Sequence, residues 1–191
     1  MTRPPDRFSH RLATVSDLPK LEVVMRLAID RLLAPYLDAA RAAASFEIMG
    51  IDSQLIADGT YFAIEYDGAI VGCGGWSNRA TLFGGDQTTN RDARLLDPAT
   101  EPARVRAMYT HPAYARRGVG RRVLSLCEAA AARHGFRSLE LVATLAGEPL
   151  YCAYGFQVVE RIEVPTSSGL TVPCARMRRP IEPRDQIHAT G

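Results

Sequence analysis

The chain has 191 residues, enough to bury one substantial core, and its length favours a single domain. A formal net charge of +2 lacks the basic excess of a general nucleic-acid-binding protein, and no run approaches the ~18 apolar residues of a membrane-spanning helix. Four widely spaced cysteines without histidines at ligand spacing predict reduced thiols, and the segment MTRPPDRFSHR lacks the apolar core of a signal peptide. We expect a soluble cytoplasmic protein that binds no metal, nucleic acid or membrane.

The first part of the chain predicts a short strand and then helices. The strand is predicted at HRLAT, residues 10–14. Apolar residues at helical spacing follow Ser16 and Asp17, either of which can cap a helix that runs to Leu33. Further helical stretches are predicted at about 37–44 and 52–57.

A change to strand-like patterning follows at residues 60–77, TYFAIEYDGAIVGCGGWS. Two apolar runs meet at Asp67-Gly68, a dipeptide typical of a tight hairpin turn. The glycines of the second run, VGCGGWS, predict close approach of another backbone. Trp76 at the end of this run could line a pocket or close the core. Residues 79–102 are polar and too long for an ordinary connection, so they are either a mobile loop that supplies specificity or a disordered insertion.

The remaining elements alternate again. Gly135 follows Arg133 and His134 and predicts the end of a helix. The predicted elements are a strand at 103–109, a helix at 122–135, a strand at 138–143, a short helix at 148–154 and strands at 155–164 and 170–181. This order predicts an α+β fold with a mixed, largely antiparallel central sheet of about seven strands flanked by helices. We expect one domain over residues 1–180 and a flexible C-terminal tail over 181–191.

The stretch HPAYARRGVGRRVL, residues 111–124, places two glycines where a loop becomes a helix. Gly118 and Gly120 allow the backbone to approach a ligand, and the first N–H groups of the helix lack intrahelical partners. Together with the helix dipole and the arginines around this turn, they favour an anion such as phosphate. A solvated basic turn and a nucleic-acid contact remain the alternatives. Neither a P-loop nor a dinucleotide fingerprint fits, because the Lys-Ser/Thr pair and the third glycine are absent.

The surrounding pattern narrows these alternatives. The strand VRAMYTHP, the turn ARRGVG, the amphipathic helix after it, the strand LELVA and the segment LYCAYGF together resemble the GCN5-related N-acetyltransferase (GNAT) family over about residues 8–178. One position departs from the family pattern, because Ala115 stands where Arg or Gln is usual. Such a turn binds mainly through backbone N–H groups, so this departure predicts weakened rather than lost cofactor binding.

The resemblance implies an N-acetyltransferase that passes an acetyl group from acetyl-CoA directly to a primary amine. Acetyl-CoA would lie in a V-shaped opening between the strand ending at Thr110 and the strand beginning near Ser138. Tyr151 would protonate the departing thiolate, since a phenol is protonated at neutral pH. The implied cofactor-binding residues are Met108, Thr110, Arg116, Arg117, Gly118, Val119, Gly120 and Arg121. A non-catalytic acyl-CoA sensor or partner domain of the same fold is the alternative.

The general base and the acceptor are not assigned by the sequence. Glu47, Glu65, Asp86 or a chain of water molecules could accept the proton of the amine, whereas His111 precedes a proline and is interpreted as a turn residue. The segment 79–102 is the candidate for acceptor contacts. The expected partner is a small-molecule or peptide amine, and a homodimer is left open.

Overall fold

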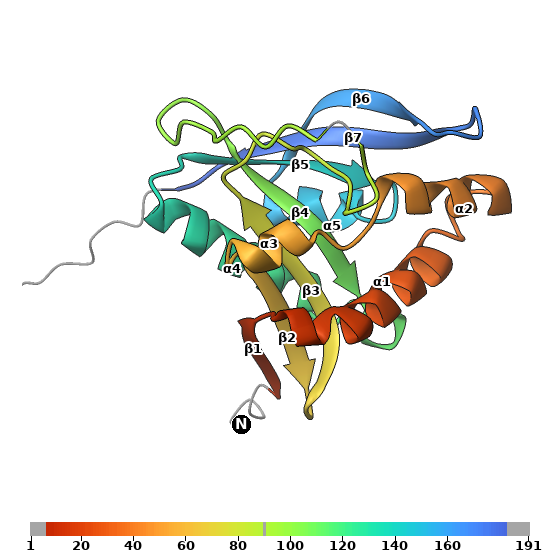
Figure 1. Ribbon diagram of the computed structural model, residues 1–191, viewed down its shortest axis with the longest axis horizontal. Coiled ribbons are helices and arrows are strands. Elements are labelled where there is room, and N and C mark those ends of the chain that lie inside the picture. The colour runs from red at the N-terminus through yellow and green to blue at the C-terminus, as the bar shows by residue number, and fades with distance from the viewer. Residues whose placement is uncertain (1–6, 90, 183–191) are drawn as a thin grey trace, which may run out of the picture.

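The computed structural model describes residues 7–89 and 91–182, which form a seven-stranded sheet flanked by helices (Figure 1). The strand order is β1-β2-β3-β4-β5-β7-β6, and β4 with β5 is the parallel pair in an otherwise antiparallel sheet. The expected fold class is thereby confirmed. The strands are β1 (Phe8–Leu12), β2 (Tyr61–Tyr66), β3 (Ala69–Ser77), β4 (Ala103–Thr110), β5 (Ser138–Thr144), β6 (Gln157–Pro165) and β7 (Thr171–Pro180). The helices are η1 (Val15–Asp17), α1 (Leu18–Leu32), α2 (Ala39–Ile48), α3 (Ser53–Ala57), η2 (Pro112–Tyr114), α4 (Val119–Arg133) and α5 (Glu148–Tyr154).

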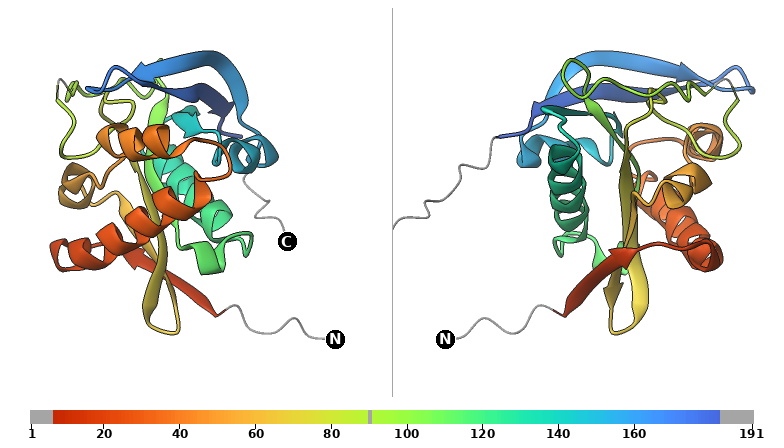
Figure 2. Two further views of the ribbon diagram at one scale, coloured as in Figure 1. Left: turned by 90° about the vertical axis from the view of Figure 1, so that its right-hand side faces the viewer. Right: turned by 60° about the vertical axis from the view of Figure 1, so that its left-hand side comes forward.

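Helices cover both faces of the sheet, as Figure 2 shows. Helices α1, α2 and α3 lie on one face, and α4 packs against the other face over β3 and β4. One cluster of buried apolar side chains fills the space under α4, and a second fills the space under α1 and α3. Burial of apolar area on both faces is the main stabilising contribution to this arrangement.

Aspartate side chains form hydrogen bonds at the starts of α1 and α2. Asp17 is the N-cap residue of α1, although its side chain makes no capping bond to that helix. Asp17 accepts hydrogen bonds from the Thr14 N–H at 2.8 Å and from Arg11 of β1, so the entrance to α1 is tied to the edge strand. Helix α2 begins at Ala39 rather than at the expected residue 37, because the Asp38 carboxylate accepts a hydrogen bond from the Arg41 N–H. It also extends to Ile48, four residues beyond the expected end.

The β2–β3 hairpin turns at Asp67 and Gly68 as expected, with both residues at positive φ. The glycines of β3 bring α4 close to the sheet. A Cβ on Gly74 would lie 2.6 Å from Met108 Cγ and 2.7 Å from Val123 Cγ1. A Cβ on Gly75 would lie 2.6 Å from the Thr60 carbonyl oxygen, which confirms the predicted close approach of another backbone.

The long connection 79–102 is folded onto the rest of the molecule over its described residues. Arg79 binds the Asp58 carboxylate at 2.8 Å, and Arg91 binds Asp52 at 2.7 Å. These ion pairs attach the first residue and the middle of the segment to the two ends of α3, so its described part is folded and is not a disordered insertion. Trp76, in the preceding strand β3, is 2% exposed and packs against Phe136, so it closes the core.

Ile181 directly follows β7, and its N–H donates to the Arg137 carbonyl at 2.9 Å. The expected flexible tail lies mostly outside the described residues. Within the described ranges, no helix has the length and apolar character needed to cross a membrane. Cys73, Cys127 and Cys174 are buried free thiols.

Candidate active site

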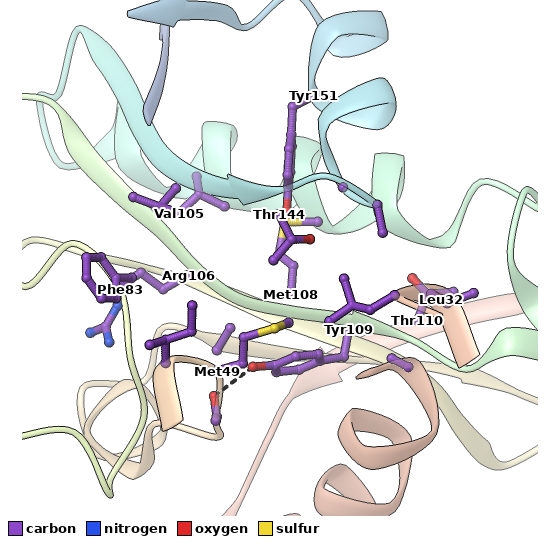
Figure 3. A pocket seen from close by; sticks show the side chains of 18 of the residues that line it. Leu32, Met49, Phe83, Val105, Arg106, Met108, Tyr109, Thr110, Thr144 and Tyr151 are labelled. Carbon is purple, nitrogen blue, oxygen red and sulfur yellow. Dashed lines mark hydrogen bonds between the residues drawn. The ribbon is translucent and has the colours of Figure 1, made fainter. Parts of the chain in front are cut away.

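The parallel strands β4 and β5 separate soon after they begin. Within the described residues, Ala103 pairs with Leu139 and Arg104 pairs with Glu140. The described positions after these two are not paired between the strands. A cavity of about 200 Å³ lies where the strands have diverged (Figure 3). Its lining comes from β4 and β5, from α5 on one face of the sheet, and from α1, α2 and residues 82–84 on the other face. This opening corresponds to the V-shaped cleft expected from the sequence.

A bulge in β4 shapes the centre of the cleft. Ala107 has φ 50°, and the register with β3 shifts between Cys73 and Gly75. A non-glycine residue in this conformation is strained, so the surrounding structure must hold it. The hydroxyl of the buried Tyr61 does so by donating a 2.7 Å hydrogen bond to the Ala107 carbonyl. Sequence reasoning missed both residues, although the glycine run in β3 was a signal of irregular pairing.

Tyr151 projects from α5 toward the bulged part of β4 (Figure 3). Its hydroxyl lies 3.9 Å from the Met108 sulfur, and its ring contacts Phe156 edge-on at 6.0 Å between centroids. Burial raises the pKa of the Tyr151 hydroxyl above its usual value, which keeps the group protonated at neutral pH. The structure therefore brings together three predicted site residues, because Thr110 lines the same cavity as Met108 and Tyr151.

The glycine-containing turn forms the N-terminus of α4. Arg116 and Gly118 adopt positive φ, and the first helical hydrogen bond runs from the Arg122 N–H to the Gly118 carbonyl. The N–H groups of Val119, Gly120 and Arg121 precede this bond and have no acceptor within the helix. A Cβ on Gly120 would lie 2.5 Å from Leu150 Cδ2, and Leu150 also lines the cavity. The turn is thus adjacent to the cleft.

The arginine side chains of this turn are held by aromatic groups. The Arg117 guanidinium lies over the rings of Phe8, Tyr66 and Tyr114, at 5.7, 5.0 and 4.8 Å from their centroids. Arg121 lies over the Tyr154 ring at 5.4 Å. These contacts hold the arginine side chains against the turn. The Arg117 N–H donates to the Tyr114 carbonyl at 3.4 Å, so the donors left for an anion are the N–H groups at the start of α4.

A buried ion pair lies on the α1–α3 side of the cleft. Arg106 of β4 donates to the Asp52 carboxylate at 2.6 Å and to the Gly84 carbonyl at 2.7 Å. Asp52 also accepts from Arg91, so one carboxylate joins β4, α3 and the 79–102 segment. The network was not expected from the sequence, because its members are 54 and 39 residues apart.

The three carboxylates considered as general bases lie outside the cavity lining. Glu47 accepts hydrogen bonds from Ser167, Glu65 pairs with Arg11, and Asp86 accepts from Ser53. The interpretation of His111 as a turn residue agrees with the structure, because its Nδ1 accepts a hydrogen bond from the Ala113 N–H at 3.2 Å. Tyr109 donates its hydroxyl to the Gly50 carbonyl at 3.0 Å, and burial raises its pKa, which disfavours a phenolate base.

Comparison with solved structures gives the same fold. A GCN5-related N-acetyltransferase from Rhodopseudomonas palustris superposes with a TM-score of 0.67 at 17% identity, over 92% of this chain and 96% of that one. A phosphinothricin acetyltransferase from Sinorhizobium meliloti in complex with acetyl-CoA gives a TM-score of 0.62 at 20% identity, over 92% and 89%. The PaiA N-acetyltransferase from Thermoplasma acidophilum in complex with coenzyme A gives 0.61 at 13% identity, over 91% and 98%.

Comparison of the sequence with protein families identifies the family of the chain. No curated protein matches the sequence. Residues 24–156, however, match the acetyltransferase (GNAT) family, and this range contains the split strands, the glycine turn and Tyr151. The chain therefore belongs to the GNAT acetyltransferase family.

Proposed function

We propose that this protein is an N-acetyltransferase that passes an acetyl group from acetyl-CoA to a primary amine. The observation that carries the proposal is the separation of β4 from β5 directly beside a helix N-terminus with available N–H donors. The first feature suits a thioester arm, and the second suits a pyrophosphate. Acetyl-CoA or coenzyme A is bound in some of the solved structures with this fold.

The backbone from Arg116 to Arg121 would hold the pyrophosphate. The N–H groups of Val119, Gly120 and Arg121, which have no acceptor within the helix, would donate to its oxygens. The pantetheine arm would lie along the free edge of β4, where Met108 and Thr110 offer backbone groups that β5 no longer pairs. Ala115 ends η2, and its N–H bonds the Pro112 carbonyl at 3.1 Å, so the missing Arg or Gln side chain leaves the backbone donors intact.

The reaction needs no covalent enzyme intermediate. The amine nitrogen attacks the thioester carbonyl carbon, a C–N bond forms and the C–S bond breaks. A backbone N–H near Met108 would stabilise the negative charge that gathers on the carbonyl oxygen. Tyr151 would give its proton to the departing sulfur and regain one, through water, from the nitrogen. All the residues named in this mechanism belong to one chain, and the proposed reaction uses no metal ion. We place the protein in the cytoplasm.

Thiol release from acetyl-CoA in the presence of a panel of primary amines tests the proposal. We expect amine-dependent release together with the acetylated amine, and a lower rate for Tyr151→Phe. Binding of coenzyme A by calorimetry is measured in parallel. Tight binding without thiol release for any amine would contradict the proposal and would favour the acyl-CoA sensor, and absence of binding would contradict both.

A further inference from the structure

The acceptor side of the cleft has an apolar wall. Tyr151 and Leu150 pack with the core under α4, whereas the opposite wall packs with the cores under α1 and α2. That wall is formed by Leu33, Ile48, Met49, Leu82, Phe83 and Val142. Phe83 and Leu82 come from the 79–102 segment, which the ion pair of Arg91 with Asp52 fixes against α3. The wall is therefore a built part of the fold.

Charged side chains at this wall are already paired. Among the described residues that line the cavity, Arg106, Tyr109 and Tyr151 are the ones with an ionisable side chain. Arg106 is 2% exposed and bound to Asp52, which is 0% exposed. Behind Asp52, Arg91 lies 2.7 Å from it and 3.6 Å from Asp86.

Carboxylates on the other elements around the cavity point elsewhere. Glu47 of α2 accepts a hydrogen bond from the Ser167 hydroxyl. Both carboxylate oxygens of Glu148, on α5, accept hydrogen bonds from Arg161. On β5, Glu140 binds Arg104 and Arg178. Asp30 and Arg31 of α1 are outside the cavity lining. A protonated amine would thus meet apolar groups, the hydroxyl-bearing side chains of the lining and a guanidinium, but no carboxylate, and burial of a cation without a counterion is strongly unfavourable.

We propose that the acceptor is a small primary amine with an apolar body, which enters as the uncharged free base and places that body against Phe83, Ile48 and Met49. This inference rests on the proposed acetyl transfer. The amine gives its first proton to bulk water before binding, so its lone pair is free to attack. As the bond to the acetyl carbon forms, the amine nitrogen loses a second proton. Water carries that proton to Tyr151, which has given its own proton to the sulfur.

The cavity also limits the size of the acceptor. About 200 Å³ is small beside the ~300–1,000 Å³ of typical ligand pockets, and the pantetheine end of acetyl-CoA must share it. Leucine amide offers a small apolar body on an α-amine of pKa ~8, and 3-methylbutylamine offers the same body on an alkyl amine of pKa ~10. Asparagine amide is the polar counterpart of similar size.

Steady-state kinetics with these three amines test the proposal. We expect kcat/KM for leucine amide to exceed that for asparagine amide by at least about tenfold. Plotted against pH, kcat/KM should rise and level off near pH 8 for leucine amide and near pH 10 for 3-methylbutylamine, since each curve follows the free base of its own acceptor. Equal use of the polar amine, or one break at the same pH for both apolar amines, would overturn it.

A variant separates the apolar wall from general effects. Phe83→Ala should raise kcat/KM for tryptophan amide relative to leucine amide by about tenfold, because removal of the ring enlarges the acceptor side. Val159→Ala, at an apolar side chain of β6 that is 51% exposed, is the matched control and should leave this ratio unchanged. An unchanged ratio in Phe83→Ala contradicts the placement of the acceptor. If charged amines react and apolar ones do not, acetyl transfer stands and this inference fails; if no amine reacts, both fail.

Discussion

The Arg106 guanidinium lies 2.6 Å from the Asp52 carboxylate, in an ion pair whose side chains are 2% and 0% exposed. Arg106 belongs to β4, and Asp52 caps α3 by accepting from the Gln54 N–H at 3.1 Å. Because Asp52 also binds Arg91, the pair couples the cleft strand to the segment that supplies Leu82 and Phe83 to the cavity lining. The shape of this part of the cavity therefore depends on one buried carboxylate.

Replacement of Asp52 should destabilise the fold strongly. Asp52→Asn leaves the buried Arg106 without its counterion, and we expect a loss of about 3–5 kcal/mol in the free energy of unfolding. Urea denaturation measures this loss. The double variant Asp52→Asn with Arg106→Met removes the unpaired charge and should be more stable than the single variant. If the double variant is the less stable of the two, the assigned role of the pair is wrong.

Tyr151→Phe should reduce kcat and leave folding intact. The hydroxyl is 3.9 Å from the Met108 sulfur, too long for a strong hydrogen bond, so its loss costs little stability. As the proposed proton donor it should contribute about 10²–10⁴-fold to kcat, with a small change in KM for acetyl-CoA. Tyr154→Phe is the matched control on the same helix, since the Tyr154 hydroxyl donates to Glu128 at 2.6 Å. A comparable loss of kcat in both variants would argue against a specific role for Tyr151.

Gly118→Val should weaken coenzyme A binding more than Arg122→Ala. Gly118 has φ 87°, a conformation that valine adopts only with strain of about 1–3 kcal/mol, so the backbone donors after it would be displaced. We expect Kd to rise at least about tenfold, and by less than about threefold for Arg122→Ala. Isothermal titration calorimetry with coenzyme A checks the order. Similar losses in the two variants would indicate that side-chain charge dominates.

Arg117→Ala should affect the nucleotide end of the cofactor alone. The three rings that surround the guanidinium hold the turn in place, so its removal should loosen the pyrophosphate site. We expect KM to rise about tenfold for acetyl-CoA and to stay constant for acetyl-pantetheine, which lacks the pyrophosphate. Arg133→Ala removes the same charge at the far end of α4 and serves as the control. An equal change in KM for both donors would place the effect elsewhere.

Acid should weaken the attachment of β1 to α1 through Asp17. Arg11 and the Thr14 N–H lower the pKa of the Asp17 carboxyl, with the Arg11 hydrogen bonds as the largest cause. A lowered folded-state pKa stabilises the protein above the unfolded value of about 3.9, and this contribution is lost as pH falls below it. Urea denaturation from about pH 6 to about pH 3 should show a steeper fall in stability for the wild type than for Asp17→Asn. Parallel curves would contradict this assignment.

Local chemistry made most elements of the fold predictable. The Asp67-Gly68 turn and the helix end at Gly135 each depend on residues a few positions apart, so sequence patterns contain them. The glycine turn before α4 was predicted for the same reason. The start of α2 differed by two residues because Asp38, rather than the apolar pattern, decides where the helix begins.

Long-range contacts decided the character of the site. The sequence by itself determined the order of the elements and the glycine turn before α4, because turns and helix ends are set by residues a few positions apart. Tyr151 was singled out by the resemblance to the family rather than by local conformation. Only the tertiary structure placed Tyr61 under the Ala107 bulge and joined Asp52 to Arg106 and Arg91, since these partners are 39 to 54 residues apart and no periodicity links them. In the tertiary structure Phe83 lines the cavity, whereas Glu47, Glu65 and Asp86 lie outside its lining. Packing in three dimensions decides which charges are buried and which groups surround them. That packing gives the proposed acceptor side its apolar wall.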